Sequence, residues 1–232
     1  EFRRVLFRSD EDTRINVKLK SGQETEINAP GPKVTHAQFE QLLSQIRRTT
    51  KDDIVIVAGS VPKSIPSDAY AQIAQITEKT GAQLVVDAEK DLVETVLPYR
   101  PLFIKPNKDE LEVMFNTTVK SDEEVIKYGK EILKKGAQSV IISLGGDGAI
   151  YVDQHQSIKA VNPQGHVVNT VGSGDSTVAG MVAGLSMGLN VDEAFQQAVA
   201  SGTATAFSED LATRDAIENI KSQVTISVLD GE

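Results

Sequence analysis

The sequence contains no cysteine and only three histidines. Without cysteine, the chain has no disulfide bond, no thiolate nucleophile and no cysteine-ligated zinc site. The histidines, His36, His155 and His166, are far apart and form no HExxH pattern, so we do not expect histidine to ligate a metal ion. No apolar run approaches the roughly 20 residues that a membrane-spanning helix needs, and none resembles the apolar core of a secretory signal. These absences lead us to expect a cytoplasmic location.

Positive charge is scarce as well, with 24 lysines and arginines against 33 aspartates and glutamates, a formal net charge of -9. This balance argues against a broad basic face, so neither nucleic acid nor a membrane surface is expected as a partner. A phosphorylated small molecule remains compatible, because helix N-termini and a few placed cations can bind an anion locally. The length of 232 residues suits one α/β domain with a substantial core.

Residues 1–9 differ from the rest of the chain. The segment is basic in an otherwise acidic sequence and matches neither a strand nor a capped helix well. We interpret residues 1–9 as a non-native or artefactual segment, with a short ordered strand as the alternative, and leave them out of the fold prediction.

The remaining sequence predicts a hairpin followed by alternating strands and helices. Residues 14–20 and 23–28 alternate apolar and polar side chains around Ser21-Gly22, which predicts an antiparallel lid hairpin within residues 13–29, with one face in water. Continuous apolar runs predict buried strands at 54–58, 84–86, 102–104, 140–142, 150–152 and 158–161, the last two as a hairpin. Helical spacing or capping boxes predict helices after Thr35, over 66–79, from Ser121 to Gly136, twice after position 172 and from near Arg214. The expected fold is α/β: a three-layer, mainly parallel sheet with helices on both faces and a small antiparallel lid over the carboxyl ends of the strands.

The strongest chemical signal is the glycine-rich segment 169–180, which contains Gly172, Ser173, Gly174 and Asp175. Glycines at a helix N-terminus can point backbone N–H groups at a phosphoryl group. A carboxylate in the first turn can then accept the proton of an attacking hydroxyl. The alternative is an ordinary loop in which Asp175 caps the helix.

This segment resembles a signature of the PfkB (ribokinase-like) carbohydrate kinases position by position. The resemblance implies that Gly172, Ser173 and Gly174 form an anion hole and that Asp175 is the catalytic base, in contact with the substrate. It implies a ribokinase-like fold and an enzyme that uses ATP and Mg²⁺. The resemblance covers the chain from about residue 10 to its end.

Two further segments carry the same resemblance. Lys105-Pro106-Asn107-Lys108-Asp109-Glu110 follows a predicted strand, and Asn107 and Glu110 are suitable oxygen donors for Mg²⁺. The resemblance assigns them to the metal and Lys105 to the nucleotide phosphates; the alternative is a simple helix start. The ATP segment of the resemblance comprises Ser143, Leu144, Gly145, Gly146, Asp147 and Gly148, for which the alternative is a tight turn.

Weaker matches concern the sugar phosphate. Arg14 and Asn16 lie in a Thr-Arg-x-Asn element whose arginine would contact the substrate phosphate, a role that suits a bidentate guanidinium. Ser60 ends the first buried strand in a Gly-Ser-Val-Pro turn and would lie near the substrate. A surface arginine and an ordinary turn serine are the alternatives. Asp87, at the end of another strand, could orient substrate or lid groups or be structural.

The resemblance implies phosphorylation of a sugar phosphate, with overall similarity favouring fructose 1-phosphate as the substrate and fructose 1,6-bisphosphate as the product. Tagatose 6-phosphate and fructose 6-phosphate are alternative substrates. Family members begin with a strand, an early aspartate and a glycine-rich turn that we do not find, so we expect residues 10–232 to be a kinase domain lacking its N-terminal segment. A catalytically inactive nucleotide-binding fragment is therefore a further alternative. A homodimer through the lid is compatible with the resemblance.

Overall fold

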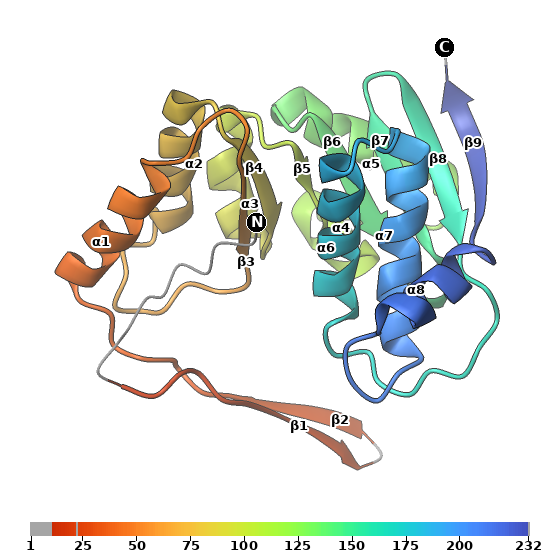
Figure 1. The fold of residues 1–232 in the computed structure, drawn as a ribbon, viewed down its shortest axis with the longest axis horizontal. Coiled ribbons are helices and arrows are strands. Elements are labelled where there is room, and N and C mark those ends of the chain that lie inside the picture. The colour runs from red at the N-terminus through yellow and green to blue at the C-terminus, as the bar shows by residue number, and fades with distance from the viewer. Residues whose placement is uncertain (1–10, 22, 232) are drawn as a thin grey trace.

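The computed structural model describes residues 11–21 and 23–231. Residues 1–9 and Gly22 of the predicted hairpin turn lie outside this range. The described residues form a two-stranded sheet and a seven-stranded sheet with helices on both faces (Figure 1). No helix in this part of the chain is long and apolar enough to cross a membrane.

The large sheet has the strand order β3-β4-β5-β6-β7-β8-β9. Its strands are β3 (Ile54–Ala58), β4 (Gln83–Asp87), β5 (Phe103–Ile104), β6 (Ser139–Ser143), β7 (Ala149–Asp153), β8 (Gln156–Val161) and β9 (Thr225–Gly231). Strands β3 to β6 pair in parallel, whereas β7, β8 and β9 add antiparallel neighbours. The parallel half and the β7–β8 hairpin follow the prediction, and β9 is an addition that the sequence reading missed.

Helices cover both faces of this sheet. Successive residues of a strand alternate between the two faces, so they pack against different sets of helices. The helices are α1 (His36–Ile46), α2 (Ala69–Thr80), α3 (Lys90–Val96), α4 (Lys108–Phe115), α5 (Asp122–Lys135), α6 (Ser173–Ser186), α7 (Val191–Ala206) and α8 (Arg214–Lys221). Leu84 and Val86 pack into one core with side chains of α1 to α5, and Val85 packs into the other with side chains of α6 and α7. Each fully buried aliphatic side chain of this kind stabilises the fold by ~1.5–3 kcal/mol.

Local signals explain where several helices begin and end. Thr35 and Gln38 form the predicted capping box at the start of α1. At α5, Ser121 accepts from the backbone N–H of Glu124, but the Glu124 carboxylate accepts from the backbone N–H of Lys120 instead of completing a box with Ser121. This helix stops at Gly136, as predicted.

Two helical predictions change in the structure. Helix α2 begins at Ala69 instead of Pro66, because residues 66–68 form a turn closed by the Ala69 N–H bond to the Pro66 carbonyl, 3.0 Å long. Helix α3 and the short 3₁₀ helix η1 (Leu97–Tyr99) were not predicted. The missed helix α3 is only 7 residues long and directly follows the strand that ends at Asp87.

The lid consists of β1 (Asn16–Ser21) and β2 (Gln23–Asn28), paired antiparallel with Asn16 opposite Asn28. It extends from the body of the molecule on the side where the parallel strands end (Figure 1). Arg14 precedes β1, although the sequence pattern placed it within the strand. One lid face carries four exposed apolar side chains: Ile15, Val17, Leu19 and Ile27. The predicted hairpin has its polar face in water, and in the described chain its apolar face is uncovered.

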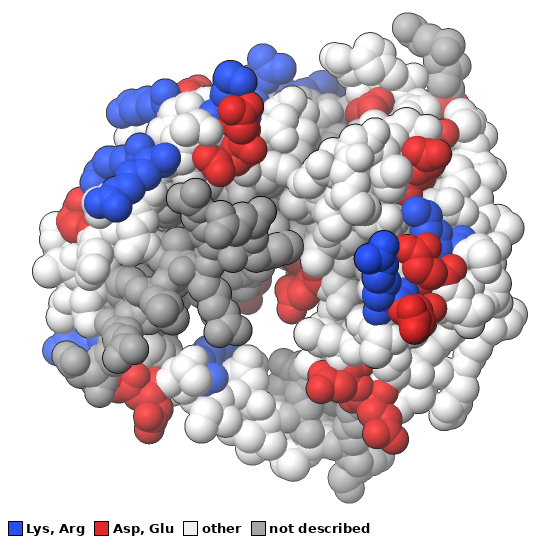
Figure 2. All heavy atoms as spheres, in the orientation of Figure 1, with Lys and Arg blue, Asp and Glu red and all other residues white. Residues whose placement is uncertain are grey.

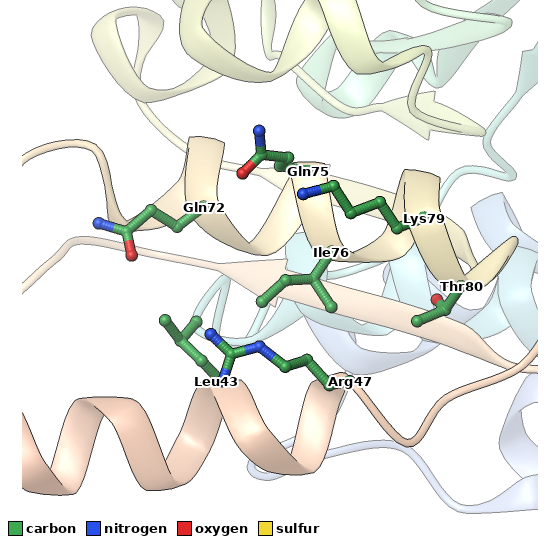
Figure 3. Close-up of a pocket in the computed structure, with 7 residues that line it drawn as sticks. All are labelled: Leu43, Arg47, Gln72, Gln75, Ile76, Lys79 and Thr80. Atoms are coloured by element: carbon green, nitrogen blue, oxygen red, sulfur yellow. The ribbon is translucent and has the colours of Figure 1, made fainter.

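A groove of about 240 Å³ lies between α1 and α2 (Figure 3). It is lined by Leu43, Arg47, Gln72, Gln75, Ile76, Lys79 and Thr80. Thr80 ends α2 just before β4 begins, so the groove extends toward the amino ends of the parallel strands. None of the predicted site residues lines it.

Candidate active site

Backbone hydrogen bonds align the ends of the four parallel strands in one row. The N–H of Gly59, after β3, donates to the carbonyl of Asp87 at the end of β4 over 2.9 Å. The N–H of Lys105, after β5, donates to Val86 O over 3.2 Å, and that of Ser143, at the end of β6, donates to Pro106 O over 3.1 Å. The predicted segments at 58–62, 105–110 and 143–148 therefore meet at the carboxyl edge of the sheet, where open α/β folds bind ligands.

A buried ion pair lies at the centre of this edge. Lys105 Nζ is 3.3 Å from Asp87 Oδ2, and the two side chains are only 7% and 17% exposed. The N-terminus of α6 packs against this pair, because a Cβ on Gly174 would lie 3.3 Å from Lys105 Nζ and 4.0 Å from Asp87 Oδ2. Figure 2 shows the molecule hollowed between the lid and the body, with acidic side chains bordering the hollow. The structure thus brings Lys105 and the glycine-rich loop together.

The electrostatics of Asp87 show that other carboxylates are near. Burial raises the pKa of Asp87 above its ordinary value, and the negative charges of Glu110 and Asp175 raise it further. Lys105 opposes this shift through its charge and its hydrogen bond to the carboxylate. Asp87, Lys105, Glu110 and Asp175 thus form one interacting cluster, although they come from three separate parts of the sequence.

The start of α6 presents backbone donors at this cluster. Gly172 is the N-cap with a φ of 82°, in the left-handed region that glycine adopts readily. The N–H of Ser173 donates to Thr170 O over 3.2 Å, whereas the N–H groups of Gly172, Gly174 and Asp175 donate to no acceptor among the described residues. The anion hole of Gly172, Ser173 and Gly174 stays a prediction, and within it Gly174 is the residue that lies against Lys105. Asp175 is exposed in the first turn, where the partial positive charge of the helix favours a carboxylate or a phosphate.

One buried hydroxyl group at this helix start is unsatisfied. The Oγ atom of Ser173 is buried and has no hydrogen-bond partner in residues 11–21 and 23–231. An unpaired buried polar atom is costly, at about 1–3 kcal/mol. A ligand with acceptor oxygens at the start of α6 fits this orphaned donor.

Close packing against α7 holds α6 in place. A Cβ on Gly180 would lie 2.8 Å from Ala198 Cα, and one on Gly184 would lie 2.8 Å from Ala194 Cα. Only glycine permits this approach of the two helices. The Ser176 and Thr205 hydroxyl groups add a hydrogen bond of 2.9 Å between α6 and α7, near the glycine-rich loop.

Asn107 and Glu110 form the start of helix α4. The Asn107 side chain accepts from the Glu110 N–H over 2.8 Å, and the Glu110 carboxylate accepts from the Asn107 N–H over the same distance. This capping box is the simple helix start weighed as the alternative to metal binding, and it occupies one oxygen of each side chain. The second carboxylate oxygen of Glu110 makes no hydrogen bond within the described residues and remains able to bind a cation or its waters. No cluster of three or more His, Asp or Glu side chains suited to a metal ion occurs in the described chain.

The segment 143–148 forms a tight turn around η2 (Gly145–Asp147). Gly148 is required by packing, because its φ is 95° and a Cβ there would lie 1.9 Å from Ala160 O. Gly146, in contrast, has neither a positive φ nor any atom within 4 Å of the place of its Cβ. The turn's own conformation and packing therefore do not require Gly146, whose bare backbone fits the close approach of a ligand such as a nucleotide.

Asn162 is a site residue that the sequence reading missed. Its side-chain NH₂ donates to the carbonyls of Gly145 and Gly146 over 3.1 and 3.4 Å, and its carbonyl oxygen accepts from the Thr203 hydroxyl over 2.8 Å. Asn162 therefore anchors the predicted nucleotide turn to α7. It belongs to no motif, so only the fold could identify it.

The predicted sugar-phosphate residues divide into two groups. Arg14 donates from its guanidinium to the Ser60 hydroxyl. Both side chains line a cavity of about 440 Å³ with Asn28, Ala29, Pro30, Gly31, Pro32, Val61, Pro62 and Lys63. Asn16, the third predicted contact, is exposed on the lid and does not line this cavity.

Comparisons with known proteins agree with this arrangement. A match to the family described as pfkB family carbohydrate kinase covers residues 3–216. The chain is 43% identical over 218 residues to 1-phosphofructokinase of Bacillus subtilis (strain 168), covering 94% of this chain and 72% of that protein. It is 35% identical over 218 residues to D-tagatose-1-phosphate kinase of Bacillus licheniformis, with the same coverage. The chain thus spans about 72% of the length of these relatives.

Solved structures share the fold. A crystal structure from Staphylococcus aureus, provisionally named a phosphofructokinase, is 80% identical and superposes with a TM-score of 0.89, covering 97% of this chain and 74% of that one. Phosphofructokinase-2 from Escherichia coli, in complex with substrates and products, is 28% identical with a TM-score of 0.82. That comparison covers 87% of this chain and 67% of the other.

Proposed function

The chain belongs to the pfkB family of carbohydrate kinases, and we propose that it transfers the γ-phosphoryl group of ATP to the C6 hydroxyl of fructose 1-phosphate, giving fructose 1,6-bisphosphate. It is a sugar-phosphate kinase, as its relatives are. The observation that carries the proposal is the start of α6, where Gly174 packs against the Lys105–Asp87 pair and Asp175 stands in the first turn. Fructose 1-phosphate is favoured because the relative 43% identical to this chain is named 1-phosphofructokinase.

In this proposal, Asp175 is the general base. Its carboxylate accepts the proton of the C6 hydroxyl as the oxygen of that hydroxyl bonds to the γ-phosphorus. The bond between the γ-phosphorus and the bridging oxygen breaks, and ADP leaves with the bonding electron pair. The Asp175 carboxylate is exposed, so a sugar hydroxyl can reach it. General-base assistance of this kind accelerates a reaction by about 10²–10⁴-fold.

The groups around Asp175 suit the charge that develops on the transferring phosphoryl group. The backbone N–H groups of Gly174 and Asp175 are fixed at the N-terminus of a 14-residue helix, so they need no reorganisation when the charge moves. Lys105 adds a cation whose position is held by Asp87. Segment 143–148, anchored by Asn162, would carry the rest of the nucleotide.

A magnesium ion is compatible with the oxygen donors at this edge of the sheet. Glu110, with Asn107, would hold the ion directly or through its waters, and Mg²⁺ commonly uses one or two carboxylates together with substrate phosphates. When bound, the ion would neutralise phosphate charge.

A panel of substrates tests the proposal. ADP release from Mg-ATP is measured with fructose 1-phosphate, tagatose 1-phosphate, fructose 6-phosphate, tagatose 6-phosphate and no sugar. The proposal expects the highest kcat/KM with fructose 1-phosphate. A higher kcat/KM with a tagatose phosphate would assign that sugar instead, and ATP binding without sugar-dependent turnover would favour a nucleotide-binding fragment.

We also propose that the lid pairs with the lid of a second copy. The support is its uncovered apolar face, on which Ile15, Val17 and Ile27 are 64%, 42% and 57% exposed. A solved structure of the related phosphofructokinase-2 from Escherichia coli is tetrameric. Because ATP and sugar phosphates are cytoplasmic metabolites, we place the reaction in the cytoplasm.

A further inference from the structure

The cavity of about 440 Å³ at the base of the lid is built by two segments joined by side-chain hydrogen bonds. The Arg14 guanidinium donates to Ser60, and the Val34 N–H donates to the Ser64 hydroxyl over 2.9 Å. Segments 28–32 and 60–63 therefore face each other across a preformed space. Tyr70 strengthens the second segment, because its hydroxyl donates to the Gly59 carbonyl over 2.9 Å.

Two cationic side chains line this cavity. Arg14 is one, and Lys63 is the other. Lys63 is exposed and forms no ion pair with any residue in 11–21 or 23–231. None of the described residues that line the cavity is a carboxylate, although the chain carries a formal charge of -9. Two cations with no acidic neighbour in the described lining form a locally positive site in an acidic protein.

The chemistry of the lining indicates a phosphate monoester as the ligand. An arginine fork and a lysine ammonium both bind phosphate oxygens well, the first as a bidentate donor and the second as a point charge. The Ser60 hydroxyl adds a neutral group that suits a sugar hydroxyl or a phosphate oxygen. The hydrogen bond between Ser60 and Arg14 already orients the guanidinium, which reduces the entropy lost when a ligand binds.

We propose that Lys63 is a specificity-determining residue that binds, together with Arg14, the phosphate group already carried by the sugar substrate. This inference rests on the proposed kinase function and adds a named residue to it. When this phosphate is bound at the base of the lid, the sugar presents its opposite end to Asp175. Lys63 thereby favours phosphorylated sugars over free sugars, without taking part in the transfer itself.

The test compares Lys63→Met with Lys51→Met, a matched change at a lysine whose side chain is 79% exposed. Lys51 precedes β3 and Lys63 follows it, so the control lies at the opposite edge of the sheet. In Lys63→Met, KM for fructose 1-phosphate should rise about 10- to 100-fold, the range expected for loss of one charge-assisted hydrogen bond. The kcat and the KM for ATP should change less than about twofold, and Lys63→Arg should recover most of the lost affinity. Lys51→Met should match the wild type.

An unchanged KM for fructose 1-phosphate in Lys63→Met would overturn the inference, as would an equal rise in Lys51→Met or a rise confined to ATP. Calorimetric titration with fructose 1-phosphate and with fructose separates this inference from the kinase proposal. Fructose 1-phosphate binding that depends on Lys63, without turnover on any sugar, would contradict the kinase proposal and support the phosphate site. Turnover on fructose 1-phosphate with equal binding by wild type and Lys63→Met would support the kinase and refute the site.

Discussion

Lys105 Nζ lies 3.3 Å from Asp87 Oδ2, against Gly174 in the first turn of α6. Asp87 ends β4 and Lys105 directly follows the neighbouring parallel strand β5, so the sheet itself sets their separation. A buried ion pair stabilises little overall, because desolvation offsets most of the attraction. It does hold the lysine in one place, which a site for transferring phosphate requires.

Removing one member of this pair should be costly. Lys105→Met leaves the Asp87 carboxylate without its counter-ion, and the free energy of unfolding at neutral pH should fall by about 3–5 kcal/mol. The double variant Asp87→Asn/Lys105→Met removes both charges and should recover a substantial part of that loss. Urea denaturation of wild type, both single variants and the double variant measures the coupling. Strictly additive losses would show that the pair does not interact.

The raised pKa of Asp87 predicts the direction in which the stability of the protein changes with pH. Because burial and neighbouring carboxylates raise this pKa above its ordinary value of 3.8, the native state favours the protonated carboxyl. The contribution of Asp87 to stability is therefore fully present below pH 3.8 and is lost as the pH rises through the folded-state pKa. Carboxyl ¹³C titration of metal-free protein should place this pKa above 3.8, and Lys105→Met should raise it further, because Lys105 lowers it. A lower value in Lys105→Met would contradict the assigned cause.

Gly146 and Gly148 are separated by one residue and should respond differently to substitution. Gly146→Ala meets no atom within 4 Å, so the protein should keep its unfolding midpoint while the KM for ATP rises about tenfold or more. Gly148→Ala would place its Cβ 1.9 Å from Ala160 O at a positive φ, so it should lower stability by several kcal/mol, as overpacking and backbone strain do. Thermal denaturation and ATP titration of both variants measure the difference. A normal KM for ATP in Gly146→Ala would remove the support for nucleotide binding at this turn.

The exposed face of the lid predicts the oligomeric state. Val17→Lys should weaken a lid-mediated dimer about 100-fold or more, because a symmetric interface loses the apolar contact twice at ~1.5–3 kcal/mol each. Val113→Lys, at an equally apolar residue 63% exposed on α4, is the control and should leave association unchanged. Sedimentation velocity at micromolar concentration distinguishes the two. A wild-type monomer, or equal effects of both variants, would exclude pairing through the lid.

Local signals in the sequence predicted most of the helices and strands but not every relation between them. The capping box of Thr35 and Gln38 and the apolar runs of the parallel strands depend on neighbouring residues, so periodicity reveals them. The Asp87–Lys105 contact joins residues on different strands and becomes visible only when β4 and β5 pair. Asn162 anchors a turn 16 or 17 residues earlier in the chain, and no motif marks it.

Other misses have a different physical origin. Strand β9 carries exposed Val228 and Leu229, which are 57% and 39% exposed, so it lacks the continuous apolar burial that identified the central strands. Asn107 and Glu110 were correctly placed at the start of a helix, and there they bond to each other's backbone. Asparagine and glutamate three residues apart suit both a capping box and an oxygen site for a metal ion, so the pattern alone could not separate the two roles.

The most direct test of the central assignment follows the phosphoryl group by ³¹P NMR. The protein is incubated with Mg-ATP and fructose 1-phosphate, and the same reaction is run with Asp175→Asn. We predict that the wild type converts the γ-phosphate signal of ATP into a second sugar-phosphate signal, at C6 of fructose 1,6-bisphosphate, and that Asp175→Asn slows this conversion about 10²–10⁴-fold while still binding ATP. Conversion at the wild-type rate in Asp175→Asn, or release of the γ-phosphate only as inorganic phosphate, would contradict the account.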